Sequence, residues 1–291
     1  MDRNKFYNLL DAPGRISLIA RDSVTSTNLL VKELGAQGAP EGTLMVASEQ
    51  TQGRGRLGRS FESPRGTGLY FTLLLRPDMS LAQSTRITVF AAVAVAEAVE
   101  EVTGLVPDIK WVNDLYYNDR KICGILAESA LAPGSDRLAY TALGIGINLE
   151  APKGGFTGSA AGVAGALYPH GGAPKELAER LLAAAANRLL RYYDETVTAA
   201  RTGSFSDENA LSYMARYRAS DYLFGRDIRI LADITRPETA VPARADAIDA
   251  EGRLLVTYPD GTREAICCGD VTVRLDAPDH GVQRETERNE P

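Results

Sequence analysis

The character of the sequence changes after Tyr222, and this change restricts the possible folds more than any other feature. Before it, the segments 80–103 and 174–195 are long and alanine-rich or amphipathic, which predicts helices. Gly104 ends the first, and Pro174 is expected near the first turn of the second. After Tyr222, five short β-rich segments follow one another with turn residues between them. These segments are Ile228 to Leu231, Ala243 to Ile248, Leu254 to Tyr258, Glu264 to Cys267 and Val271 to Leu275.

The chain is therefore predicted to contain two folded parts. Residues 1–222 are expected to form an α+β domain in which helices pack on a sheet, and residues 223–276 a small β-barrel domain. The polar residues 277–291 are predicted to be a disordered tail.

The α+β domain is predicted to hold two further helices. One covers residues 23–38, where Ser26 or Thr25 is placed to cap the first free N–H groups and Gly35 is a plausible end. The other covers residues 206–219. The strands are predicted at 43–49, 69–75, 109–111, 115–117, 121–129 and 140–149.

Charge and cysteine content argue against several classes of protein. The net charge of −6 argues against a general affinity for DNA or for an anionic membrane, and no apolar run reaches the length of a membrane span. Cys123, Cys267 and Cys268 form neither a disulfide framework nor a metal-binding pattern. This cysteine usage makes a reducing cytoplasm the simplest expectation, and the polar residues 1–10 do not resemble a signal peptide.

The segment 50–59, Q-T-Q-G-R-G-R-L-G-R, combines glycines with cationic side chains. The glycines let the backbone approach a ligand closely. Arg54, Arg56 and Arg59 supply guanidinium groups, whose planar donors match carboxylate and phosphate. Taken alone, the segment is as compatible with a solvated basic loop, or with an Arg/Gly segment of the kind that binds RNA, as it is with a ligand-binding loop.

Residues 110–124 contain the only tryptophan, Trp111, and the start of a predicted hairpin. On this hairpin Lys121 and Asp114 are placed to face one pocket. Lysine neutralises a carboxylate or phosphate, and aspartate accepts a proton or holds a metal. An ordinary exposed ion pair is the alternative. Cys123 is predicted to be a small buried side chain rather than an acyl carrier.

Two weaker patterns complete the set. Gly144 and Gly146 alternate in a predicted strand, which indicates a bulge or a close backbone approach. Asn148, two residues later, offers a donor and an acceptor to a base edge. Ser26 and Thr27 stand at a helix start, where free N–H groups receive polar ligands.

Together and in this order, these segments resemble the catalytic domain of biotin protein ligases. The resemblance covers residues 16–149 and depends on the glycine-arginine loop and on K-W-V-N-D at 110–114. It implies a class II synthetase-like mixed sheet with packed helices, and the C-terminal strands resemble the family's SH3-like barrel. It also implies that biotin and ATP, with Mg²⁺, form biotinyl-AMP. A carbon–nitrogen ligase reaction then transfers biotin to a lysine of a biotin carboxyl carrier protein.

The same resemblance implies roles for individual residues. The implied catalytic residues are Lys121, Arg54, Arg56 and Asp114, the last also as a Mg²⁺ ligand. The implied biotin-binding residues are Ser26, Thr27, Gln50, Gly53, Arg54, Gly55, Arg56, Lys121 and Gly124. The implied nucleotide-binding residues are Arg56, Arg59, Phe61, Lys110, Trp111, Asn113 and Asn148.

The sequence departs from the family pattern at two positions. Val112 stands where proline is usual, and Phe61 stands near the place of a tryptophan that packs on adenine. Too few residues precede Ser26 for a winged-helix repressor domain, which together with the net charge argues against transcriptional control. The net charge also leads us to expect no nucleic-acid or membrane partner. The alternatives are lipoate or octanoate attachment, an arginine-loop nucleic-acid-binding protein, and a non-catalytic relative. A homodimer is left open.

Overall fold

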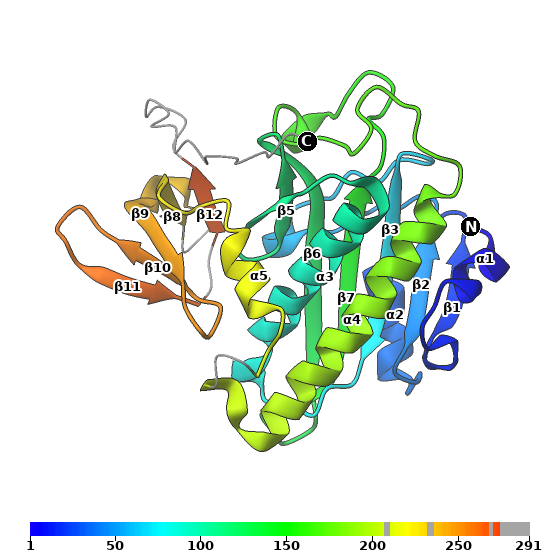
Figure 1. The fold of residues 1–291 in the computed structure, drawn as a ribbon, viewed down its shortest axis with the longest axis horizontal. Coiled ribbons are helices and arrows are strands. Elements are labelled where there is room, and N and C mark those ends of the chain that lie inside the picture. The colour runs from blue at the N-terminus through cyan, green and yellow to red at the C-terminus, as the bar shows by residue number, and fades with distance from the viewer. Residues whose placement is uncertain (207–209, 232–235, 268–269, 274–291) are drawn as a thin grey trace, which may run out of the picture.

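The computed structural model describes residues 1–206, 210–231, 236–267 and 270–273. Its larger part is a seven-stranded sheet with the strand order β1-β2-β3-β7-β6-β5-β4 (Figure 1). β1 and β2 run parallel and the other neighbours run antiparallel, so the sheet is mixed. The strands are β1 (Ser17–Arg21), β2 (Thr43–Ala47), β3 (Gly68–Leu75), β4 (Asp108–Lys110), β5 (Asp114–Tyr117), β6 (Arg120–Leu131) and β7 (Leu138–Asn148).

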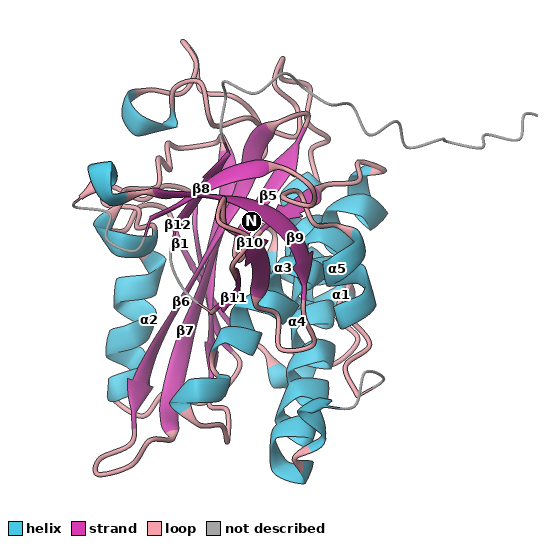
Figure 2. Ribbon diagram, turned by 90° about the vertical axis from the view of Figure 1, so that its left-hand side faces the viewer, coloured by secondary structure: helices cyan, strands magenta, loops and turns pink. Residues whose placement is uncertain are grey.

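Helices cover both faces of this sheet, as Figure 2 shows. α2 (Thr27–Ala36) packs against β3 and β7 on one face. On the other face, α3 (Thr85–Thr103) and α4 (Leu177–Thr202) pack against each other, with the short α1 (Arg3–Asn8) beside α4 and α5 (Met214–Ala219) beside α3. Burial on both faces explains why β3 is an almost continuous apolar run rather than an alternating one.

The C-terminal part is a five-stranded antiparallel sheet with the order β11-β10-β9-β8-β12, which lies beside α5 in Figure 1. Its apolar side chains, such as Leu254 and Val256, belong to the same core cluster as those of α3. All five predicted strands are present, although 274–275 lie outside the described residues. The strands are β8 (Asp227–Leu231), β9 (Val241–Ile248), β10 (Leu254–Thr257), β11 (Arg263–Ile266) and β12 (Asp270–Val273).

The predicted fold class, a mixed α+β sheet followed by a small β unit, is therefore confirmed. The exact domain boundary after residue 222 stays a prediction, and the tail predicted at 277–291 lies outside the described residues. Within the part of the chain that the structure describes, no helix is long and apolar enough to cross a membrane.

Three helix predictions were wrong in detail. Gly35 lies inside α2, where a Cβ atom would come within 2.8 Å of the Tyr140 ring, so this glycine allows close packing instead of ending the helix. Pro174 precedes α4, which runs from Leu177 to Thr202. Of the described residues in 206–219, only those of α5 form an α-helix.

Candidate functional site

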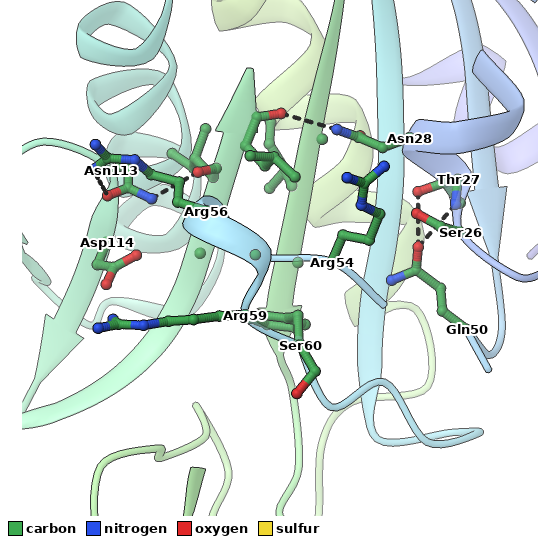
Figure 3. A pocket seen from close by; sticks show the side chains of 18 of the residues that line it. Ser26, Thr27, Asn28, Gln50, Arg54, Arg56, Arg59, Ser60, Asn113 and Asp114 are labelled. Carbon is green, nitrogen blue, oxygen red and sulfur yellow. Dashed lines mark hydrogen bonds between the residues drawn. The ribbon is translucent and has the colours of Figure 1, made fainter. Parts of the chain in front are cut away.

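A pocket lies where the start of α2 and the loop after β2 meet β5, β6 and β7 (Figure 3). It brings together residues from all four segments that the sequence analysis selected. Its lining residues are Ser26, Thr27, Asn28, Gln50, Arg54, Gly55, Arg56, Leu57, Arg59, Ser60, Phe61, Asn113, Asp114, Lys121, Gly124, Ile125, Leu126, Gly144, Ile145 and Gly146.

One wall of the pocket is a hydrogen-bonded network at the N-terminus of α2. Gln50 Oε1 accepts hydrogen bonds from Thr27 N at 2.9 Å and from Thr27 Oγ1 at 3.1 Å. Gln50 Nε2 donates to Ser63 Oγ at 3.0 Å. The amide of Gln50 thus caps α2, whereas the side chain of Ser26 makes no capping bond. This corrects the prediction that Ser26 or Thr25 caps the helix.

The same wall continues into a buried polar cluster that the sequence analysis missed. Asn28 Nδ2 donates to Leu126 O and to Glu128 Oε2, both at 3.1 Å. Asn28 Oδ1 accepts from Thr72 Oγ1 at 2.7 Å. A Cβ atom at Gly144 would lie 2.0 Å from Asn28 Oδ1, and no register shift interrupts β7 at that point. Of the two predicted meanings of the alternating glycines, the close approach is confirmed.

Glu128 links this cluster to the arginine loop. Lys32 Nζ lies 2.8 Å from Glu128 Oε1, and Arg54 Nη1 lies 3.6 Å from the same oxygen. Burial alone would raise the pKa of Glu128. The hydrogen bonds from Lys32 and Asn28, with the charges of Lys32 and Arg54, hold that pKa below its usual range. Glu128 is therefore an anion that orients Arg54 beside the pocket.

The glycine-arginine loop folds into a tight turn against the pocket. Gly55 N donates to Arg59 O at 2.7 Å, and Leu57 and Gly58 between them have positive φ values of 55° and 77°. Arg56 Nη1 donates to Asn113 Oδ1 at 3.1 Å, which ties the loop to the K-W-V-N-D segment. Figure 3 shows that the arginine side chains of this loop spread over the pocket in different directions.

The opposite wall holds an ion pair. Lys121 Nζ lies 2.7 Å from Asp114 Oδ1, and the two side chains are only 26% and 18% exposed. Asp114 Oδ1 is buried, and the Lys121 ammonium is its charged partner. A Cβ atom at Gly124 would lie 3.3 Å from Lys121 Nζ, so this glycine leaves room for the lysine to fold back. The prediction that Lys121 and Asp114 face one pocket is confirmed, and the exposed-pair alternative is wrong.

Phe61 lies on a floor made by glycines of β6 and β7. A Cβ atom added to Gly146 would lie 2.6 Å from the Phe61 ring, and one added to Gly124 would lie 3.1 Å from it. The ring also packs edge-on against Tyr70, with centroids 6.4 Å apart. The backbone of Phe61 lies close to Gly53, where a Cβ atom would come within 2.2 Å of Phe61 O. The absence of side chains on the strands therefore makes the space that Phe61 fills.

Several predicted site residues do not line the pocket. Asn148 is 5% exposed, and its Nδ2 donates to Gly165 O at 2.9 Å. Trp111 is 4% exposed, and its Nε1 donates to Gly252 O at 3.0 Å. The Lys110 ammonium lies 5.4 Å from the centroid of the Tyr116 ring. Gly53 has the packing role described above. The nucleotide contacts of Asn148, Trp111 and Lys110 stay predictions.

Cys123 has the environment that the sequence predicted. Its side chain is fully buried on β6, and this burial raises the pKa of the thiol well above its usual range, with the charge of Asp114 acting in the same direction. A buried neutral thiol is a poor nucleophile. Cys123 is therefore a packing residue beside the ion pair.

Comparison with known proteins agrees with this site. Residues 18–148 match the model of the biotin/lipoate A/B protein ligase family. The chain carries a domain of this family. This ligase domain includes the arginine loop, the K-W-V-N-D segment and all the residues that line the pocket.

Two curated relatives and one solved structure define the similarity further. The chain is 40% identical over 164 residues to the bifunctional ligase/repressor BirA of Bacillus subtilis, a match that covers 51% of this chain and 50% of that protein. It is 35% identical over 142 residues to the biotin–[acetyl-CoA-carboxylase] ligase of Paracoccus denitrificans, covering 47% and 56%. The chain thus spans about half the length of these curated relatives.

The structural match is more complete. The biotin protein ligase from Aquifex aeolicus in complex with biotin and ATP aligns with a TM-score of 0.67 and 27% identity. The alignment covers 89% of this chain and 98% of that one. Similarity to this structure therefore reaches beyond the residues that the family model matches.

Proposed function

We propose that this ligase domain activates biotin with ATP, forming biotinyl-AMP and pyrophosphate, and then transfers biotin to a lysine ε-amine of a biotin carboxyl carrier protein. The main support is that three loop arginines and Lys121 line one pocket whose other wall is an uncharged hydrogen-bonding network. The similar Aquifex aeolicus protein was solved with both biotin and ATP, and the Paracoccus denitrificans relative is named for the same reaction.

The uncharged wall is suited to a polar ring without net charge. Ser26, Thr27 and Gln50 supply hydroxyl and amide groups that both donate and accept hydrogen bonds, as the ureido ring of biotin requires. Beside them, Asn28 packs on Gly144 and Phe61 packs on Gly146, so both side chains are held close to β7 at the edge of the pocket. We therefore place the biotin ring at this end of the pocket.

In the first proposed step, a carboxylate oxygen of biotin attacks the α-phosphorus of ATP. The bond from that phosphorus to the bridging oxygen breaks, and pyrophosphate leaves. Negative oxygens crowd together in this step, so fixed cations lower its barrier. Arg56, held by Asn113, and Lys121, held by Asp114, are positioned before the substrates arrive.

In the second proposed step, the neutral ε-amine of the acceptor lysine attacks the carbonyl carbon of the anhydride. The amide bond forms, AMP leaves, and the nitrogen loses a proton. Asp114 is the only carboxylate among the described residues that line the pocket, so it is our candidate for accepting or orienting that proton.

Magnesium, when bound, neutralises charge on the phosphates of ATP. Among the described residues, no group of three or more histidine, cysteine, aspartate or glutamate side chains could hold a metal ion. Mg²⁺ commonly uses one carboxylate together with substrate phosphates and water. Asp114, the only carboxylate among the described residues that line the pocket, would supply that single carboxylate.

Exchange between ATP and pyrophosphate tests the proposal. With Mg²⁺ present, we expect exchange that depends on biotin and not on lipoate or octanoate. Exchange with lipoate or octanoate would assign the sister activity, and no exchange with any of them would refute the proposed activation. Lys121→Met removes the charge at similar side-chain length and should abolish exchange, whereas Lys153→Met, at an exposed lysine outside the pocket, should not.

A further inference from the structure

The K-W-V-N-D segment lies at an edge of the large sheet, and the C-terminal part of the chain covers that edge. β4 is the last strand of the sheet. Beyond it, Ile109 N donates to Ser220 O at 2.7 Å and Tyr222 N donates to Ile109 O at 3.0 Å. The chain that leads from α5 to the small sheet therefore continues the hydrogen bonding where the large sheet ends.

Trp111 and Val112, two and three residues after Ile109, are held from the same side. Trp111 Nε1 donates to Gly252 O in the small sheet at 3.0 Å, and this contact is buried. Tyr217 Oη, from α5, donates to Val112 O at 3.3 Å. Both partners are C-terminal to the residues that match the ligase family.

The turn that carries Gly252 is itself rigidly placed. Asp249 Oδ1 accepts hydrogen bonds from Glu251 N and Arg253 N, both at 2.9 Å. Gly252 has a φ of +80°, and a Cβ atom there would lie 2.9 Å from Val89 Cγ2 of α3. The turn is therefore pressed against α3, and only glycine fits at the position whose carbonyl accepts from Trp111.

The residues that follow Trp111 and Val112 line the pocket. Asn113 Oδ1 accepts from Arg56, Asn113 Nδ2 donates to Ile125 O at 2.8 Å, and Asp114 pairs with Lys121. A shift of the backbone at Trp111 is transmitted to these side chains over two or three bonded residues. Such a shift would also move Arg56 and Lys121, the cations that contact Asn113 and Asp114.

We propose that the turn 249–252 of the small sheet, acting through the hydrogen bond from Trp111 to Gly252 O, positions Asn113 and Asp114, so that the small sheet sets the adenylation geometry without touching the substrates. Gly252 and Trp111 are then positioning residues. The inference rests on the proposed function, because its kinetic test measures biotin-dependent exchange.

Trp111→Phe is the first test, because it keeps an aromatic ring and removes the N–H donor. A misplacement of about 1 Å costs on the order of 10²-fold in rate, so we expect kcat for exchange to fall by about tenfold or more. The KM for biotin should change by less than about twofold, because Thr27 and Gln50 bond to each other whereas Trp111 bonds to Gly252.

Two controls separate positioning from loss of stability. Val256→Ala removes core volume from β10 of the small sheet and leaves the Trp111 contact in place. It should therefore lower the stability of the protein without lowering kcat. The comparison is made at temperatures where circular dichroism shows that all variants are folded. The double variant Trp111→Phe/Asn113→Ala should lose less activity than the two single losses combined, because part of the Trp111 effect passes through Asn113 and its contact with Arg56. Additive losses would overturn the proposal.

Gly252→Ala tests the other partner. The added methyl group collides with Val89, so the turn must move and kcat should fall as in Trp111→Phe; Val89→Ala in the same chain should restore part of it. Trp111 is the only tryptophan, so its fluorescence reports the contact without substrate, and Gly252→Ala should shift the emission.

The outcomes distinguish the two proposals. If the wild-type protein shows no biotin-dependent exchange, the proposed function fails, while the emission shift still tests the contact. If it shows exchange and both Trp111→Phe and Gly252→Ala match Val256→Ala in kcat, the positioning role is overturned.

Discussion

Gly144→Ala is expected to be far more damaging than a single added methyl group suggests. The new Cβ atom would lie 2.0 Å from Asn28 Oδ1 and 2.6 Å from Asn28 Cγ, well inside contact distance. Asn28 cannot move aside freely, because it is 4% exposed and its side chain is hydrogen-bonded to Leu126 O, Glu128 and Thr72. The substitution must therefore break the polar cluster behind the pocket.

The size of the effect follows from those contacts. Each buried polar group left without a partner costs about 1–3 kcal/mol. An overpacked methyl group costs about 1–3 kcal/mol more. With two groups left without partners, we expect Gly144→Ala to lower the free energy of unfolding by about 3 kcal/mol or more, and Tm by about 6 °C or more. Biotin binding should weaken as well, because Thr72 also contacts Thr27 Oγ1 at 2.8 Å.

Gly146→Ala is the matched control, two residues along the same face of β7. Its Cβ atom would meet the Phe61 ring at 2.6 Å, but this half-buried side chain is on a loop and can rotate away. We expect a loss below about 1.5 kcal/mol. Urea unfolding measures both free energies, and calorimetric titration measures biotin affinity. Equal losses in the two variants would refute the argument that the hydrogen bonds of Asn28 determine how much stability Gly144→Ala loses.

Three further predictions concern ionisable groups. Asp114→Asn should slow transfer from isolated biotinyl-AMP to the carrier protein more than it slows ATP–pyrophosphate exchange; equal slowing would point to a metal-binding role. Burial raises the pKa of Asp221 to about 6. A hydrogen bond from Leu223 N lowers this pKa, and the charge of Asp108 raises it. The folded pKa lies above the ordinary 3.8, so the stabilisation from protonated Asp221 is complete below about pH 4 and is lost as the pH rises through about 6. Asp221→Asn should therefore exceed the wild type in urea-measured stability at pH 7.5 by up to about 3 kcal/mol, with no gain near pH 4; a gain independent of pH would contradict this. Cys123→Ala should keep both half-reactions within about twofold, and loss of transfer alone would identify a covalent carrier.

The parts of this protein that could be predicted from its sequence are those with local causes. The hairpin that brings Lys121 to Asp114 turns at Asn118 and Asp119, whose φ values of 50° and 56° suit residues that tolerate the left-handed region. The five short strands were predicted from turn residues between apolar runs. The arginine loop was recognised because its glycines and arginines stand together in ten residues.

The polar wall of the site depended on contacts between distant parts of the chain. Gln50 caps a helix that begins more than twenty residues before it, and Glu128 orients Arg54 across the sheet. No composition or periodicity near these residues marks them, because a hydrogen bond between distant residues depends on how the elements pack. The alternating glycines showed that something approaches β7, but only the fold identifies Asn28 and Phe61 as the neighbours.

The relation between the two sheets also depends on the tertiary structure. From the sequence, the small sheet is a separate unit whose role is open. In the folded protein its apolar side joins the core beneath α3, and its 249–252 turn accepts the hydrogen bond from Trp111. A buried indole N–H requires an acceptor, and only the packing of the two sheets determines that Gly252 supplies it.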